Sequence, residues 1–253
     1  MERWINRVAI VTGASGGIGK AITIALLKSG MVVVGIARRE DLLVKLKNEV
    51  SNLHGKFYYK SFNVRNEQDI IECVQWTIKI CGSVDVLVNN VGNFDLAGLI
   101  DETMEHAKMI METNYLSGCI FTKEVIKAMK SKGIDDGHII NINSVAGHYR
   151  SEPTKALIHN ASKHCITLTT DTIRRMLVQD GSKIKITSLS PGLTLTEHTK
   201  SFLASKPEIT FVRAEDVANA ALYILGTPPS MRVNNKICWR NYILILKIYN
   251  YLL

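Results

Sequence analysis

The glycine-rich segment at residues 12–19 constrains the fold of this chain more than any other feature. It reads TGASGGIG and lies between a short apolar run at residues 8–11 and a segment of helical periodicity at residues 18–27. Glycines between a buried strand and a helix allow a sharp turn and let the first amides of the helix face an anion. The segment therefore predicts a strand, a loop and a helix that together bind the phosphates of a dinucleotide.

The rest of the chain alternates in the same way. Apolar, β-branched runs, typical of strands covered on both faces, alternate with stretches in which apolar residues recur every three or four positions. The predicted strands are residues 8–11, 31–36, 57–62, 84–88, 138–142 and 184–189, and the predicted helices include residues 18–27, 67–80, 104–129 and 161–177. This order predicts an α/β protein with a doubly wound parallel sheet of six strands, a three-layer α/β/α Rossmann fold in a single domain.

Charge and cysteine usage argue against several classes of protein. The 253 residues include 31 Lys and Arg against 23 Asp and Glu, a net charge of +8. The basic residues are scattered, so a nucleic-acid partner is not expected. The five cysteines match no metal or redox spacing, so we expect no metal site and a reducing compartment. The N-terminus lacks a signal-peptide pattern, and the expected location is the cytoplasm.

The last part of the chain differs from the rest. Residues 5–229 form the predicted domain, and residues 230–253 form an atypical tail after the turn signal at residues 226–229. The apolar end at residues 242–253 is too short to span a bilayer and contains a lysine, so it is not a transmembrane segment. The favoured interpretation is an edge strand or a packing arm, while membrane-surface contact and an aggregation hazard remain open.

Each glycine of the segment has an expected role. Gly13 permits the sharp turn, Gly17 lets the backbone approach a pyrophosphate, and Gly19 allows close packing of the helix on the strand. The other residues of the predicted phosphate site are Ser15, Gly16 and Ile18.

The end of the second predicted strand indicates which dinucleotide binds. A site for NAD would place an acid there to bond the ribose 2′-hydroxyl, but this sequence continues with Arg38 and Arg39. Paired guanidinium groups bind a 2′-phosphate with bidentate geometry, so the sequence favours NADP(H) over NAD(H).

Further motifs follow in order along the chain: NNVG at residues 89–92, Asn114, Ser144, Lys163 and Pro191 with Gly192. With these motifs the chain resembles the short-chain dehydrogenase/reductase family from about residue 5 to residue 229. The stretches at residues 35–39, 143–148 and 225–229 look most similar to the insect farnesol-dehydrogenase type, whose members interconvert hydrophobic alcohols and carbonyls with NADP(H).

The resemblance implies a role for each matching residue. Ser144 would hold the substrate oxygen, Asn114 would maintain a proton-relay water near a kink in a long helix, and Lys163 would bind the ribose hydroxyls. The remaining cofactor contacts that it implies are Asn63, Val64, Asn90, Val91, Gly92, Pro191, Gly192, Leu193, Thr194 and Thr196.

One position departs from the family in a way that affects the chemistry. The family's proton donor and acceptor is a tyrosine four residues before the lysine, and His159 stands there in this chain. Residues four apart on a helix face the same way, so His159 and Lys163 can still address one site, including the cofactor. The lysine charge disfavours imidazolium and should hold His159 neutral, and the shorter ring should reduce turnover.

Other departures and neighbours have smaller consequences. Asn63 stands where the family usually has an aspartate beside the adenine, and Val91 replaces an alanine, so cofactor affinity is expected to fall without being lost. Tyr149 is expected to be a packing or surface residue rather than a substitute phenol, and His148 and His164 are expected to be structural.

Two functions are compatible with these residues. The first is an NADP(H)-dependent oxidoreductase that moves a hydride between the nicotinamide and a hydrophobic alcohol, ketone or aldehyde. The alternative is a catalytically weak or inactive NADP-binding member of the family, because of His159. The resemblance also implies a homodimer or homotetramer assembled through the helices predicted at residues 104–129 and 161–177.

Overall fold

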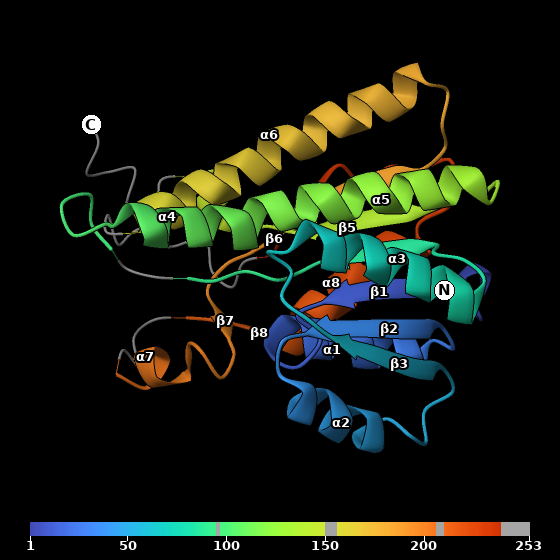
Figure 1. The fold of residues 1–253 in the computed structure, drawn as a ribbon, viewed down its shortest axis with the longest axis horizontal. Coiled ribbons are helices and arrows are strands. Elements are labelled where there is room, and N and C mark those ends of the chain that lie inside the picture. The colour runs from blue at the N-terminus through green and yellow to red at the C-terminus, as the bar shows by residue number, and fades with distance from the viewer. Residues whose placement is uncertain (95–96, 150–155, 206–209, 239–253) are drawn as a thin grey trace.

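A computed structural model describes residues 1–94, 97–149, 156–205 and 210–238 (Figure 1). A seven-stranded sheet forms the centre, with the order β3-β2-β1-β4-β5-β6-β9 and every neighbouring pair parallel. Its strands are β1 (Val8–Thr12), β2 (Val32–Ala37), β3 (Lys56–Ser61), β4 (Val86–Asn89), β5 (His138–Ile142), β6 (Lys185–Pro191) and β9 (Asn235–Cys238). The predicted doubly wound α/β fold is confirmed.

The helices cover both faces of this sheet. They are α1 (Gly17–Lys28), α2 (Glu40–Glu49), α3 (Glu67–Cys81), α4 (Met104–Met111), α5 (Ser117–Ser131), α6 (Leu157–Gln179), α7 (Lys200–Ala204) and α8 (Ala214–Gly226). Short elements complete the described chain: the turns η1 (Glu2–Trp4), η2 (Glu112–Leu116) and η3 (Val145–Gly147), and the small pair β7 (Thr194–Leu195) and β8 (Val212–Arg213). None of the described helices is both long and apolar enough to cross a membrane.

Successive side chains of each central strand enter different hydrophobic cores. Ala9 and Val11 pack with residues of α1, α2 and α8, whereas Ile10 between them packs with residues of α3, α5 and α6. Because side chains alternate across a strand, a strand covered on both faces must be apolar at every position. This explains why the sequence shows continuous apolar runs at these strands.

The predicted strands are all present, with ends that differ by one or two residues, but the sheet has seven strands rather than six. The additional strand, β9, comes from the tail and pairs with β6 at the edge of the sheet. An edge strand was the favoured interpretation of the tail, and residues 235–238 are one. The apolar end at residues 242–253 lies outside the described residues.

The predicted helix at residues 104–129 is interrupted. A single π-helical segment, η2, separates α4 from α5 and contains the buried residues Thr113 and Asn114. Apolar spacing is similar in α and π turns, so the pattern of the sequence does not reveal this insertion. The resemblance implies a kink near Asn114, and η2 interrupts the α-helix at this residue.

Candidate active site

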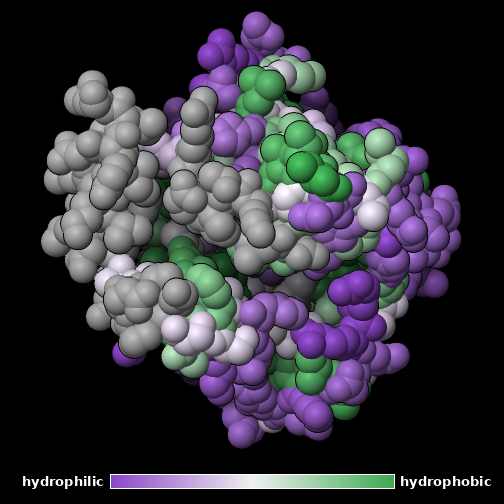
Figure 2. Space-filling model, turned by 90° about the vertical axis from the view of Figure 1, so that its left-hand side faces the viewer, coloured by the Kyte–Doolittle hydropathy of each residue, from purple (hydrophilic) through white to green (hydrophobic). Residues whose placement is uncertain are grey.

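The carboxyl ends of the parallel strands bring most of the expected site residues to one edge of the sheet. The arrowheads of β1, β2 and β3 point to the left in Figure 1, and Figure 2 views the molecule from that side. Hydrophobic surface is exposed there within a hollow, between hydrophilic regions (Figure 2). Ligands of open parallel sheets bind outside the carboxyl ends of their strands, so this edge is the candidate site.

The glycine loop between β1 and α1 adopts a conformation that other residues rarely adopt. Gly13 and Gly17 have φ angles of 71° and 53°, in the left-handed region. A Cβ atom on Gly19 would lie 2.3 Å from the oxygen of Gly13 and 2.4 Å from Nδ2 of Asn90. The loop is therefore packed too closely for any side chain at position 19.

The start of α1 fits a bound phosphate. Gly16, its N-cap, has no side chain to accept hydrogen bonds from the first amides of the helix. These unpaired amides and the positive end of the helix dipole favour an anion. The expected residues Ser15 and Ile18 lie in this loop and in the first turn. The geometry thus fits the pyrophosphate of a dinucleotide.

Hydrogen bonds from Thr12 join the glycine loop to the segment after β4. Thr12 Oγ1 accepts from the amides of Asn90 at 2.9 Å and Val91 at 3.1 Å, and Asn90 Nδ2 donates to the Thr12 carbonyl at 2.8 Å. Asn90 and Val91 are therefore held beside the glycine loop, as expected for residues that contact the same ligand.

Basic and polar groups surround the loop on the side of β2 and β3. Arg38 and Arg39 are exposed, and a Cβ atom on Gly16 would lie 3.7 Å from Nη2 of Arg39. Asn63 is exposed and accepts from the amide of Arg65 at 3.2 Å, while Val64 is buried. Arg39 is thus adjacent to the predicted phosphate site.

The segment after β6 reaches the same loop from the other side. A Cβ atom on Gly17 would lie 3.0 Å from Cγ2 of Thr196. Thr199 Oγ1 accepts from the amide of Thr196 at 2.9 Å and donates to the Thr194 carbonyl at 2.6 Å, which stabilises this turn. Pro191 is the last residue of β6, and Gly192 and Leu193 connect this strand to β7.

Asn114 lies on η2 and holds the backbone of Asn93. Asn114 Oδ1 accepts from the Asn93 amide at 2.7 Å, and Asn114 Nδ2 donates to the Asn93 carbonyl at 2.9 Å and to Ser162 Oγ at 3.1 Å. All the polar atoms of this buried amide therefore have partners. The side chain fixes the segment after β4 relative to α6.

Lys163 is buried beside Asn114. Its Nζ donates to the Ile142 carbonyl at 3.1 Å, and a Cβ atom on Gly92 would lie 3.7 Å from Nζ and 3.6 Å from Asn114 Oδ1. Burial lowers the pKa of Lys163 to about 8. The structure therefore brings Gly92, Asn114 and Lys163 together.

His159 lies one turn before Lys163 and is held by a residue that the sequence did not single out. Its Nδ1 lies 3.0 Å from the Asn93 carbonyl, and the Phe94 ring meets it edge to face at 5.0 Å. Burial and the charge of Lys163 lower the pKa of His159 to about 4, although the Asn93 carbonyl opposes this shift. The expected neutral imidazole is the form that this environment favours.

Ser144 follows β5 and caps η3. Its Oγ accepts from the Ala146 amide at 3.1 Å, so the hydroxyl hydrogen remains available to a ligand. Gly147, at the end of η3, packs closely on the backbone of α6, because a Cβ atom there would lie 2.7 Å from the Lys163 carbonyl. The serine loop is thereby fixed beside the lysine.

The two neighbouring histidines have hydrogen-bond partners close by, and the neighbouring tyrosine lies at the surface. His148 Nε2 lies 2.8 Å from Ser190 Oγ, and His164 Nδ1 lies 2.9 Å from the Asn160 carbonyl. Tyr149 is exposed. Ser190 is completely buried near the end of β6, so the contact with His148 joins the serine loop to β6.

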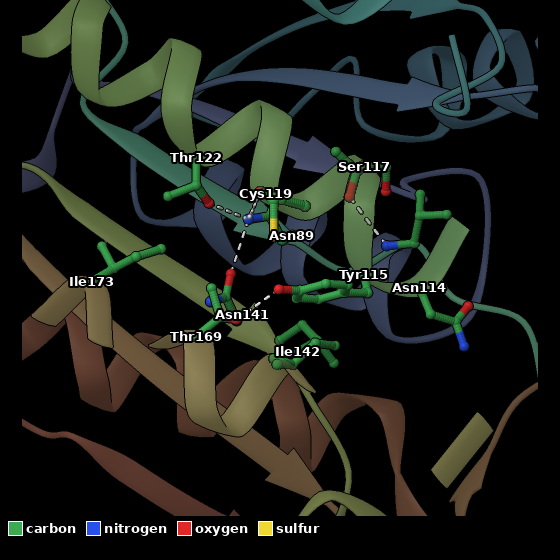
Figure 3. Close-up of a pocket in the computed structure, with 14 residues that line it drawn as sticks. Asn89, Asn114, Tyr115, Ser117, Cys119, Thr122, Asn141, Ile142, Thr169 and Ile173 are labelled. Carbon is green, nitrogen blue, oxygen red and sulfur yellow. Dashed lines mark hydrogen bonds between the residues drawn. The ribbon is translucent and has the colours of Figure 1, made fainter. Parts of the chain in front are cut away.

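A small polar cavity lies beneath Asn114 and extends between β4, β5, α5 and α6 (Figure 3). Its volume is about 30 Å³, and Asn89, Tyr115, Thr122 and Asn141 contribute to its polar wall. Asn89 Nδ2 donates to Thr122 Oγ1 at 3.0 Å and to Asn141 Oδ1 at 2.9 Å, whereas its buried Oδ1 has no partner among the residues that the structure describes. The size and polarity suit an ordered water.

The sequence motifs did not indicate Asn93 and Phe94, nor the cavity residues Tyr115, Thr122 and Asn141. Asn93 acts through its backbone, which no side-chain motif records. Among the described residues no group of three or more His, Cys, Asp and Glu side chains could hold a metal ion.

Known proteins resemble this chain over nearly its whole length. The family model described as short chain dehydrogenase matches residues 7–207. Farnesol dehydrogenase of Aedes aegypti is 40% identical over 238 residues, which cover 92% of this chain and 96% of the relative. Dehydrogenase/reductase SDR family member 11 of Homo sapiens is 33% identical over 247 residues, which cover 93% and 94%.

Solved structures agree in fold. Actinorhodin polyketide ketoreductase with NADPH has a TM-score of 0.81 at 26% identity, with 92% of this chain and 96% of that chain covered. The alcohol dehydrogenase of Thermococcus sibiricus complexed with 5-hydroxy-NADP has a TM-score of 0.79 at 24% identity, with 93% and 98% covered. None of these matches supports the alternative of a nucleotide-binding protein without turnover.

Proposed function

Because the chain belongs to the short-chain dehydrogenase/reductase family, we propose that it is an NADP(H)-dependent oxidoreductase that interconverts a hydrophobic alcohol and its ketone or aldehyde. The observation that carries the choice of cofactor is the Arg39 guanidinium beside Gly16, together with the absence of an acid at the end of β2. A 2′-phosphate next to this loop would find a cation there, whereas a 2′-hydroxyl would find no carboxylate at the end of β2.

Exposed apolar side chains support a hydrophobic substrate. Phe94 follows β4 and is 56% exposed, Leu157 begins α6, and Phe202 lies on α7, each of the last two 40% exposed. The relative named farnesol dehydrogenase acts, by its name, on a long apolar alcohol. An apolar ligand covering such side chains would remove their surface from water, which favours binding.

The residues of the site would have separate roles in binding the cofactor and the substrate. The glycine loop, Arg38, Arg39 and the residues at 90–92 and 191–196 would hold the cofactor, which when bound supplies or accepts the hydride. Ser144 would donate its free hydroxyl hydrogen to the substrate oxygen. Lys163 would bind the ribose hydroxyls, and Asn114 would keep both the Asn93 backbone and the cavity in place.

We also propose that the protein works in the cytoplasm as a homodimer or homotetramer. The five free cysteines support a reducing compartment. Exposed apolar side chains on η2 and α6 support the assembly, with Leu168 70% exposed.

Nucleotide titrations test the proposed function. NADPH should bind at least about tenfold more tightly than NADH, because the extra phosphate adds charge-assisted hydrogen bonds. Arg38→Ala and Arg39→Ala, made separately, should each weaken NADPH binding and leave NADH binding unchanged, as measured by nucleotide fluorescence.

Arg175→Ala is the matched control, since Arg175 is an exposed arginine that pairs with Asp171 on α6. Equal affinity for the two nucleotides, or no effect of either variant, would contradict the choice of NADP(H). Turnover is then assayed with hydrophobic secondary alcohols and ketones.

A further inference from the structure

The hydrogen bond between His159 and Asn93 determines which ring nitrogen can act on a substrate. A backbone carbonyl only accepts, so the ring nitrogen 3.0 Å from it, Nδ1, must carry a hydrogen. In the neutral ring the other nitrogen, Nε2, then has a lone pair and no hydrogen. Among the described residues Nε2 has no hydrogen-bond partner.

This tautomer is held from two sides. Asn114 binds both the amide and the carbonyl of Asn93, so the acceptor cannot turn away from the imidazole. The Phe94 ring packs edge to face against the same imidazole, with 5.0 Å between the ring centroids. In the other neutral tautomer the lone pair of Nδ1 would face the Asn93 carbonyl oxygen, which is repulsive.

We infer that His159 is the proton acceptor of this site and that it takes the hydroxyl proton of the alcohol through Nε2 while the Asn93 carbonyl holds Nδ1–H. This inference rests on the proposed function. The carbinol C–H bond breaks and its electron pair leaves as hydride to oxidised NADP, the O–H bond breaks, its proton forms a bond to Nε2, and the carbonyl double bond forms. The reverse reaction requires imidazolium as the donor.

The surroundings of His159 disfavour its protonated form, imidazolium. Burial and the Lys163 ammonium on the same helix lower the pKa of His159, and the Asn93 carbonyl raises it by less. The charged or ionisable groups on the elements packed against α6 are not among the causes of this shift. They are Glu105, His106 and Lys108 of α4, Glu112 and Tyr115 of η2, Lys185 of β6 and His148 beside η3. With a pKa of about 4, His159 is neutral throughout the range from pH 6 to pH 8.

A pH profile follows from this assignment. The kcat/KM of alcohol oxidation should vary by less than about twofold between pH 6 and pH 8, because the acceptor is already unprotonated. The kcat/KM of the matching carbonyl reduction should fall about tenfold per pH unit, because the donor form becomes rarer. The ratio of the two kcat/KM values then rises about tenfold per pH unit, as the release of one proton in the overall oxidation requires.

His159→Tyr should exchange these slopes. Below the pKa of a tyrosine the phenol is protonated, so oxidation should rise with pH and reduction should be flat. A merely structural role of His159 would leave the slopes as they are in the unsubstituted protein.

The tautomer can be measured without turnover. In ¹⁵N NMR of the protein alone, His159 should show a protonated Nδ1 and an unprotonated Nε2. His138 is an internal control of opposite kind: Thr187 Oγ1 donates to the Val233 carbonyl and so accepts from His138 Nε2, which must carry the hydrogen.

A protonated Nε2 on neutral His159, or an oxidation rate that rises tenfold per pH unit in the unsubstituted protein, would overturn the inference. A chain that binds NADPH but oxidises none of the alcohols would also overturn it, while leaving the nucleotide site intact. A chain that binds no NADPH would overturn the proposed function itself.

Discussion

His138 is a histidine in the interior of the sheet, where a charge is poorly solvated. It is 1% exposed on β5, and its Nε2 lies 2.9 Å from Thr187 Oγ1. Burial, followed by the nearby cations Lys185, Arg3 and Arg232, lowers its pKa to about 3. The folded protein therefore keeps this imidazole neutral down to a pH of about 3, whereas in the unfolded chain it is protonated below a pH of about 6.5.

Acid should destabilise the fold through this residue. The unfolded histidine, with a pKa of about 6.5, binds more protons than the folded one, so stability is fully present above pH 6.5 and is lost as the pH falls toward 3. One such group lowers the free energy of unfolding by up to about 1.4 kcal/mol for each pH unit in this range. Urea unfolding at pH 5 and pH 7 should show a clear loss of stability at pH 5.

His138→Gln, which does not titrate, should show a smaller difference between the two pH values. His159 acts in the same direction, so some dependence should remain in that variant. An unchanged difference between pH 5 and pH 7 would mean that His138 is not responsible.

At the scale of elements, Thr12 connects β1 to the segment that follows β4. Its hydroxyl oxygen accepts from two backbone amides, those of Asn90 and Val91, and the residue is 3% exposed. Within the described part of the chain these two amides have no other acceptor, so both depend on a single side-chain oxygen.

Thr12→Val should destabilise the protein by about 1–3 kcal/mol, because it keeps the shape of the side chain but leaves two amides without an acceptor. Thr23→Val is the matched control. Thr23 is also completely buried, but its Oγ1 has no hydrogen-bond partner, so the methyl group should be neutral or stabilising. Equal losses in urea unfolding of the two variants would contradict this account of Thr12.

At the scale of the whole molecule, one surface has the properties of an interface between copies of the chain. Helices α4, α5 and α6 lie together at the top of Figure 1. On α6, Leu168 and Met176 lie eight residues apart, on one face, and are 70% and 56% exposed, and Leu116 on the adjoining η2 is 45% exposed. A symmetric dimer would cover this apolar stripe.

Leu168→Glu should therefore convert the proposed dimer or tetramer to a smaller species in light scattering, because it places charges against each other across a two-fold axis. Val44→Glu is a suitable control, since Val44 is 39% exposed on α2, which packs in the other core. A monomeric unsubstituted protein would show that the proposed assembly is wrong.

The sequence by itself determined the class of fold and most of the cofactor loop. Apolar runs located the strands β1 to β6 within one or two residues, and Gly13, which was expected to permit a sharp turn, has a positive φ angle in the structure. These signals are local, because hydrophobic periodicity and turn chemistry depend on neighbours in the chain. The positions of His159 and Lys163 on one helix could be predicted for the same reason.

Only the tertiary structure decided how distant residues act on one another. The contact between His159 and Asn93 spans 66 positions, and the contact of Thr12 with Asn90 spans 78. The tail residues 235–238 become a strand because β6 offers an unpaired edge. Such contacts follow from the packing of strands and helices, and several use backbone atoms that every residue shares. No motif could therefore reveal that a carbonyl holds the histidine in one tautomer.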